Sequence, residues 1–216
     1  MLIVLASNNQ GKLRELKDLL LGDIEVKTAG ALGLELPEET GSTFEENAFL
    51  KAKSVAAATH QIAVADDSGL EVDALDGAPG VFSARFAGEP SDDARNNALL
   101  LVKLAGIPPK QRTARFQSVV AVVGPNGEAF SARGTIEGEI LEAPRGSGGF
   151  GYDPLFLIRG YNRTMAELSL DEKNAISHRA HAFRGVIEQL TALLSTYNDC
   201  RVNGTDVRSS HIEVET

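Results

Sequence analysis

Cysteine is nearly absent from this chain of 216 residues, in which Cys200 is the only one. A single cysteine can form neither a disulfide within the chain nor a cysteine-ligated zinc site, and we assign Cys200 no role. The first residues lack the basic region and cleavage site of a signal peptide. No apolar run approaches the roughly 20 residues of a membrane-spanning helix. We therefore expect a cytoplasmic protein without a membrane partner.

Positive charge is also scarce, because 21 lysines and arginines stand against 30 aspartates and glutamates, for a net charge of -9. An extended nucleic-acid surface needs a broad positive field, so we expect no nucleic-acid partner and a small anionic ligand instead. A chain of this length with 43% hydrophobic residues can bury one substantial core. We expect residues 1–197 to form a single bilobed domain and residues 198–216 to form a polar, poorly ordered tail.

The polar hexapeptide SNNQGK follows the apolar residues 2–6 and precedes apolar positions at helical spacing from Leu13 to Leu20. This pattern predicts a buried strand, a turn and an amphipathic helix. Such a turn directs backbone N–H groups and the positive end of the helix dipole at one point, which suits a phosphate, and Lys12 adds a positive charge. An ordinary helix capped by Ser7 or Asn9 is the alternative.

A second helix is predicted after Thr43 and Glu46, which have the spacing of a capping box. This helix carries Asn47 and Lys51 on one face, where they either bind a ligand or are solvated. Glu39, just upstream, is either a surface acid or an oxygen ligand for a hard cation.

Two consecutive acids, Asp66 and Asp67, follow a predicted buried strand over residues 62–65 that we expect to end at Ala65. Adjacent residues of an extended chain point to opposite faces, so one of the two should face a given site. Buried carboxylates require a cation, hydrogen bonds or solvent. A turn capped by Asp66 is the alternative. The role of Arg85, downstream in the same segment, stays open.

Residues 91–105 read as a helix whose leucine-rich face packs inward, and we assign it no part in the chemistry. Residues 115–123 and 129–134 flank a Pro-Asn-Gly turn and predict a long hairpin.

A glycine cluster stands directly before Phe150, Tyr152 and Asp153. Glycine-rich backbone permits close approach of a ligand, and an aromatic ring presented on it can stack on a planar base. Burial of Phe150 in the core is the alternative.

The last helix is predicted to begin at a capping box formed by Ser169 and Glu172. Near its start it carries Lys173, His178 and Arg179, which either bind a ligand or form a solvated basic face with a structural histidine.

Together these segments resemble the inosine triphosphate pyrophosphatase family, also called dITP/XTP pyrophosphatases. Members of this family hydrolyse non-standard purine nucleoside triphosphates such as ITP, dITP and XTP to the monophosphate and pyrophosphate. The matching motifs occur in the family's order and cover residues 1 to about 196: SNNQGK, EETGSTFEENAFLKA, ADDSGLEVDALDGAPGVFSARF, GGFGYDPLF and DEKNAISHR.

The resemblance implies an α/β fold with a mixed central sheet, flanking helices and two lobes around a nucleotide-binding cleft, usually as a homodimer. It implies that Asp67 is the general base or metal anchor, and that Glu39 and Asp67 hold Mg2+. The substrate-binding residues that it implies are Ser7, Asn8, Asn9, Gln10, Gly11 and Lys12 for the triphosphate, with Asn47, Lys51 and Ser68 nearby, and Phe150, Gly151, Tyr152, Asp153, Lys173, His178 and Arg179 for the purine.

Three other functions remain open at this point. The first is a related enzyme of the septum-formation-inhibitor type, which hydrolyses modified pyrimidine or other nucleotides. The second is a nucleotide-binding regulator without turnover, which would bind ITP and release no pyrophosphate. The third is a nucleic-acid binder, which would show a steep salt dependence.

The polar tail yields a first prediction. Removing residues 198–216 leaves turnover unchanged, because none of the motifs lies there. The check is a steady-state assay of the truncated protein beside the full chain. A large loss of turnover in a folded truncation contradicts it.

Overall fold

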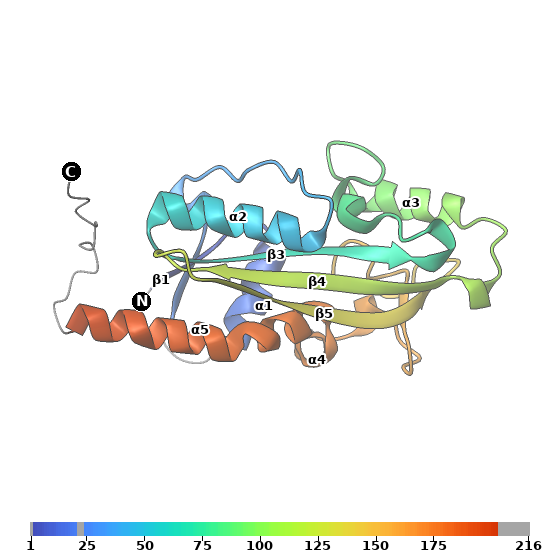
Figure 1. The fold of residues 1–216 in the computed structure, drawn as a ribbon. Helices are drawn as coiled ribbons and strands as arrows, with labels where there is room; N and C mark the ends of the chain where they lie inside the picture. The colour runs from blue at the N-terminus through green and yellow to red at the C-terminus, as the bar shows by residue number, and fades with distance from the viewer. Residues whose placement is uncertain (1, 21–23, 203–216) are drawn as a thin grey trace.

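The computed structural model describes residues 2–20 and 24–202, which form a mixed six-stranded sheet in the order β2-β1-β3-β4-β5-β6 (Figure 1). β1 runs parallel to β2 and β3, and the remaining neighbours are antiparallel. The strands are β1 (Leu2–Leu5), β2 (Glu25–Thr28), β3 (Ile62–Val72), β4 (Thr113–Val123), β5 (Ala129–Ile140) and β6 (Phe156–Ile158).

Helices cover both faces of the sheet, with α2 on one face and α1 and α5 on the other (Figure 1). The α-helices are α1 (Gln10–Leu19), α2 (Phe44–Thr59), α3 (Asp93–Lys103), α4 (Leu170–Ile176) and α5 (His178–Val202). Short 3-10 helices are η1 (Gly30–Leu32), η2 (Asp73–Leu75), η3 (Gly80–Arg85), η4 (Pro109–Gln111) and η5 (Met165–Glu167). The predicted mixed sheet with flanking helices is confirmed.

The core follows from the apolar pattern of the central strands. In β1, Ile3 and Leu5 pack into a cluster beneath α5, whereas Val4 packs into a second cluster beneath α2. Both faces of β1 are therefore buried, which explains its unbroken apolar run. A third cluster, which includes Leu70 and Phe156, fills the other end of the long strands.

The predicted end of the third strand is wrong. β3 continues through Asp66 and Asp67 to Val72, and this whole stretch pairs with β4. Asp, Ser and Gly are poor strand formers, but the ladder to β4 satisfies their backbone groups. β1 pairs with β3 only as far as Val64. The two acids therefore lie in mid-strand, just beyond the end of β1.

The predicted last helix is in fact two helices. Ser177 has ψ 154°, which ends α4, and its buried Oγ accepts a hydrogen bond from the N–H of Ala180 in α5. His178 therefore begins α5. This helix includes residues 198–202 of the predicted tail, and residues 203–216 lie outside the described residues.

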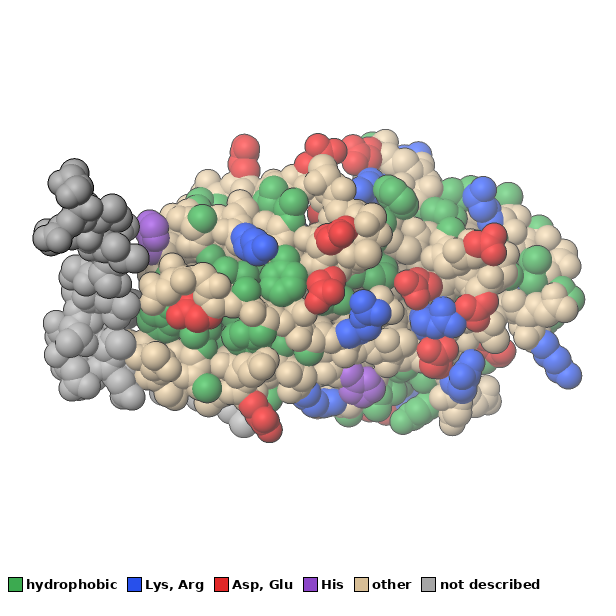
Figure 2. Space-filling view, in the orientation of Figure 1, with side chains coloured by type: hydrophobic (Ala, Val, Ile, Leu, Met, Phe, Trp, Pro, Cys, Tyr) green, Lys and Arg blue, Asp and Glu red, His purple; other side chains and the backbone are tan. Residues whose placement is uncertain are grey.

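The surface is mixed in charge (Figure 2). Acidic and basic side chains intermingle on the face in view, with hydrophobic side chains visible between α2 and α5. Within residues 2–20 and 24–202, no helix has the length and hydropathy needed to cross a bilayer.

The contact between β5 and α5 requires a glycine, and this yields a second prediction. A Cβ on Gly134 would overlap the carbonyl oxygen of His178 and the backbone nitrogen of Ala182. Gly134→Ala should therefore lower the free energy of unfolding by about 1–3 kcal/mol. Urea unfolding measures this. The exposed neighbour Arg133 supplies the control, since Arg133→Ala should change stability by less than about 0.5 kcal/mol. Equal stability of both variants contradicts the prediction.

Candidate active site

A cleft of about 280 Å³ lies where the N-terminus of α1, the middle of β3 and the start of α5 meet. Its polar lining comes from separate segments of the chain, most of which carry one of the motifs described above. The predicted residues that line it are Asn9, Lys12, Glu39, Asp67, Ser68, Phe150, Gly151, Tyr152, Asp153, Lys173, His178 and Arg179.

The two neighbouring acids of β3 face opposite sides of the sheet, as predicted. The carboxylate of Asp66, 4% exposed, lies 3.0 Å from Lys12 Nζ and 2.9 Å from Arg179 Nε. Ser68 Oγ also donates a hydrogen bond to it, at 2.9 Å. Burial alone would raise the pKa of Asp66, but Lys12, Arg179 and Lys51 outweigh it and hold this pKa well below its ordinary value. Asp66 therefore anchors cations and stays ionised.

Asp67 points to the α2 side, where it meets Asn47 and Lys51. Asn47 Nδ2 and Lys51 Nζ each lie 3.2 Å from its carboxylate. Lys51 Nζ also bonds the carbonyl oxygen of Asp66 at 3.0 Å and Glu39 Oε1 at 2.5 Å. Lys51 is only 5% exposed. Its position in a network of oxygens, and not in solvent, favours the ligand-binding interpretation of this helix face.

The charge of Asp67 is less well compensated than that of Asp66. Burial raises the pKa of Asp67, Lys51 opposes this effect, and the carboxylate of Glu39 adds to it. Glu39 itself has a lowered pKa, because Lys51 outweighs the effect of its burial. Two carboxylates thus converge on one ammonium group. The donor set fits a hard cation, since Mg2+ is usually held by one or two carboxylates, substrate phosphates and water.

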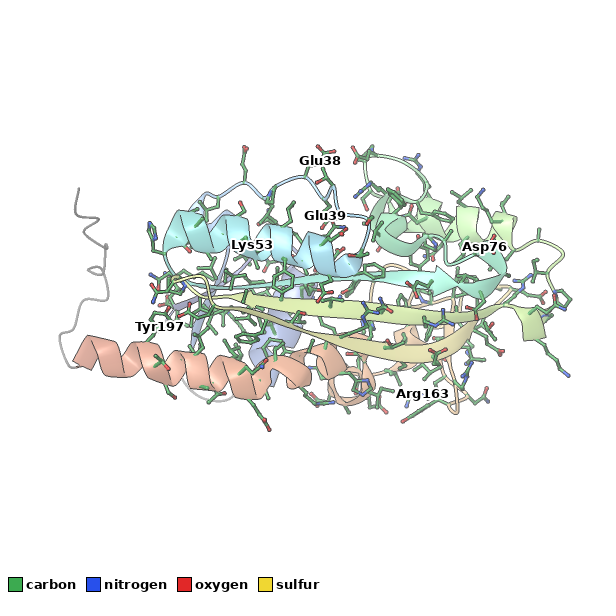
Figure 3. All side chains as sticks on the ribbon, in the orientation of Figure 1. Glu38, Glu39, Lys53, Asp76, Arg163 and Tyr197 are labelled. Carbon is green, nitrogen blue, oxygen red and sulfur yellow. The ribbon has the colours of Figure 1, made fainter. Side chains whose placement is uncertain are left out.

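Glu39 is held by Arg85 as well as by Lys51. Arg85 Nη2 donates to the carbonyl oxygen of Glu39 at 3.4 Å, and Arg85 Nη1 lies 3.7 Å from the carboxylate. The neighbouring Glu38 is exposed and points away from the sheet (Figure 3). Arg85, whose role the sequence left open, therefore braces the acidic loop.

The turn SNNQGK caps α1, which was the alternative interpretation, and its role as a phosphate site stays a prediction. Asn9 caps α1 by accepting the N–H groups of Gly11 and Lys12, and Ser7 Oγ accepts the N–H of Asn9. Asn8 Oδ1 accepts the N–H of Gly30 and thus holds the turn against η1. Of the residues in this turn, all of them described, Asn9 and Lys12 line the cleft. The capping interpretation is correct, and Lys12 provides the positive charge.

Phe150 is exposed by 38% and is not a core residue. Lys173 Nζ lies 4.6 Å from the centre of its ring, and the guanidinium carbon of Arg179 lies 5.7 Å from it. Asp153 accepts hydrogen bonds from the N–H of Phe150 at 3.0 Å and from Lys173 Nζ at 2.8 Å. The glycine loop therefore presents one aromatic face to the cleft beside two cations.

His178 is buried and stacks on Phe116, with ring centres 5.0 Å apart. Burial, followed by Arg179 and Lys173, lowers the pKa of His178 well below its ordinary value, so the imidazole is neutral near pH 7. Its Nδ1 finds no hydrogen-bond partner among the described residues. A buried ring nitrogen at a cleft is suited to bonding a ligand.

Several lining residues carried no signal in the sequence. Phe116 lines the cleft and supports His178 from an ordinary apolar strand. Ser118 is not part of the lining, but its Oγ is hydrogen-bonded to Ser68 Oγ at 2.9 Å. Because Ser68 donates its one hydroxyl proton to Asp66, Ser118 is the donor in this bond. Asp93 comes from the helix to which no chemistry was assigned. These residues join the site through contacts between strands or between distant segments, which local patterns do not predict.

Comparisons with known proteins agree with these motifs. The model of the Ham1 family matches residues 3–189. A protein of Desulforamulus reducens named dITP/XTP pyrophosphatase is 52% identical, over 89% of this chain and 97% of that protein. The solved Ham1 protein of Staphylococcus aureus is 44% identical with a TM-score of 0.77, over 91% of this chain and all of that one. A HAM1 protein of Coxiella burnetii, also 44% identical, has a TM-score of 0.79 over 91% of this chain and 99% of that chain. The chain belongs to the Ham1 family.

Proposed function

We propose that this chain hydrolyses non-standard purine nucleoside triphosphates, namely ITP, dITP and XTP, to the nucleoside monophosphate and pyrophosphate, and so clears them from the nucleotide pool. The observation that carries the proposal is that Asp66 and Asp67 lie in different surroundings on opposite faces of β3. One binds Lys12 and Arg179, and the other faces the cleft beside Glu39. The names of the relatives support the substrate class.

The phosphates are assigned to the end of the cleft that Lys12 lines. Lys51 lies beside this end, bonded to the lining residues Glu39 and Asp67. Cleavage between the α and β phosphates needs a water directed at the α-phosphorus and positive charge that stabilises the departing pyrophosphate. Asp67 is the general base or the metal anchor.

Mg2+ is the proposed metal, and Glu39 and Asp67 would hold it. When bound, it would supply positive charge to the triphosphate oxygens. The convergence of both carboxylates on Lys51 Nζ supports this assignment, because their oxygens must lie near one another.

The purine is assigned to the glycine loop and the start of α5. Phe150 would stack on the base, with Gly151, Tyr152 and Asp153 forming the wall beside it. Donors from Lys173, His178 or Arg179 would favour the 6-keto oxygen of hypoxanthine or xanthine and would meet an unmatched amino group in adenine. The orphaned Nδ1 of His178 supports its place in this group.

We further propose that the chain acts as a cytoplasmic homodimer. The dimer rests on the resemblance described above. Light scattering on the purified protein tests it, and a monomer mass at assay concentration contradicts it.

The substrate assignment yields a third prediction. Pyrophosphate release should be strong from ITP and XTP and weak from GTP, ATP and dTTP when the five are assayed in parallel with Mg2+. Asp67→Asn should cut turnover by about a hundredfold or more, because it removes the base or anchor charge with little change in volume.

Circular dichroism of the Asp67→Asn variant controls for its fold. Preference for dTTP would place the protein with the pyrimidine enzymes, and binding without pyrophosphate release would make it a regulator. Near-normal turnover of a folded Asp67→Asn protein would refute the role of that residue.

The metal assignment yields a fourth prediction. Glu39→Gln should raise the Mg2+ concentration needed for half-maximal turnover by about tenfold or more, because it removes one of the two proposed ligand charges. The matched control is Glu38→Gln, which changes the exposed neighbour in the same way. An unchanged Mg2+ requirement in Glu39→Gln, or an equal rise in both variants, argues against Glu39 as a ligand.

A further inference from the structure

Helix α3, to which the sequence assigned no chemistry, contacts the glycine loop through its first turns. Asp93 Oδ2 accepts the N–H of Gly151 at 2.7 Å. One helical turn later, Asn97 Nδ2 donates to the carbonyl oxygen of Gly151 at 2.9 Å. Residues four apart lie on the same helix face, so two side chains of α3 hold both polar groups of one loop residue.

Gly151 is the loop residue whose backbone conformation most needs these hydrogen bonds. It has φ +59° and directly follows Phe150. Glycine has the widest choice of backbone conformations, so its conformation must be fixed from outside. On its other side the loop is held by Tyr152, whose hydroxyl donates to the carbonyl oxygen of Ser83 at 2.8 Å. The bonds to α3 therefore restrain the residue that directly follows Phe150.

The same helix turn also holds the facing wall of the cleft. Asn96 Nδ2 donates to the carbonyl oxygen of Ala84 at 3.0 Å, and Asn96 Oδ1 accepts the N–H of Ala87 at 2.7 Å. Ala84 and Gly151 both line the cleft. Consecutive residues of α3, Asn96 and Asn97, thus tie the end of η3 and the glycine loop to one rigid element.

The helix is itself well anchored at its other end. Leu100 and Leu104 are fully buried in the third core cluster. Arg112 donates hydrogen bonds to the carbonyl oxygens of Leu104 and Ile107, both at 2.9 Å. The first bond satisfies the carbonyl group of Leu104, which caps the helix end, and the second holds the turn that follows it. Because α3 is fixed in the core at one end, its first turns can hold the glycine loop in a fixed position relative to the core.

We propose that Asp93 and Asn97 are positioning residues of the base subsite, which fix Gly151 and thereby hold Phe150 against the purine. This inference rests on the proposed stacking role of Phe150. The base lies away from the reacting phosphorus, so an interaction lost there weakens substrate and transition state equally. We call the two hydrogen bonds from Asp93 and Asn97 to Gly151 the clamp. Loss of the clamp should therefore raise KM and leave kcat unchanged.

The kinetic test compares three variants at the N-terminus of α3. Asp93→Ala removes the acceptor and should raise KM for ITP about threefold to tenfold with kcat unchanged. Asp93→Asn loses the same charge but keeps an acceptor oxygen, so it should restore KM to near the original value. Asp92→Ala also loses one charge and removes the helix cap, since Asp92 Oδ1 accepts the N–H of Arg95. It should leave KM unchanged, because it leaves the clamp intact.

A second measurement tests the mobility of the glycine loop in the absence of any nucleotide. The chain has no tryptophan, so Phe150→Trp introduces a single tryptophan on the loop, which can be excited at wavelengths that tyrosine does not absorb. Adding Asp93→Ala to this variant should raise quenching of the tryptophan by acrylamide, because the loop is released. Adding Asp92→Ala or Asp93→Asn should leave quenching unchanged.

The outcomes separate the clamp from the proposed function. Unchanged quenching in the Asp93→Ala reporter overturns the clamp, whatever the enzyme hydrolyses. Increased quenching with an unchanged KM shows a clamp that does not serve substrate binding and also overturns the proposal. If KM rises equally in Asp92→Ala and Asp93→Ala, the cause is a loss of helix stability, and this result overturns the proposal as well. An unchanged KM in Phe150→Ala instead refutes the stacking role in the proposed function.

Discussion

The site depends on one geometric constraint, which is that neighbouring residues of a strand point to opposite faces. Because β3 continues through Asp66 and Asp67, two chemically identical side chains enter different environments. Asp66 meets two cations from α1 and α5, while Asp67 shares Lys51 with Glu39. Their pKa values are therefore shifted in opposite directions, Asp66 down and Asp67 up. One acid can serve as a permanent counter-charge only because the other is kept apart from it.

Lys12, in the cleft lining, and Lys51, beside it, are both held by buried acids. Burial lowers the pKa of Lys12, and Asp66 only partly offsets this, whereas Asp67, Glu39 and Asp66 together raise the pKa of Lys51 despite its burial. Such charges cost free energy to bury and are retained where paired groups fix them. In the proposed function, a triphosphate would meet positive groups that are already desolvated and oriented. Charge fixed in advance is what stabilises a developing anion most effectively.

Local features of the fold could be predicted from sequence, and features made by distant contacts could not. The capping boxes at Thr43 and Ser169 both form as predicted, since a cap involves residues three apart. The full length of β3 was missed, because pairing with β4 overrides the turn-like composition of its middle. The break at Ser177 was missed for a similar reason, because an apolar stripe continued past it. Most of the residues that line the cleft could be named from motifs, yet their partners could not.

The contact between α3 and the glycine loop could not be predicted from the loop's own motif. A glycine-rich loop suits close approach to a ligand because its backbone is unrestricted, but an unrestricted loop cannot hold an aromatic ring in one place. Here the flexible segment and the element that restrains it lie far apart in sequence, in Gly151 and Asp93. The restraint acts on backbone groups, so the loop itself carries no sign of it. In our proposal, binding of the base thus depends on a helix that has no residue of its own in any recognised motif.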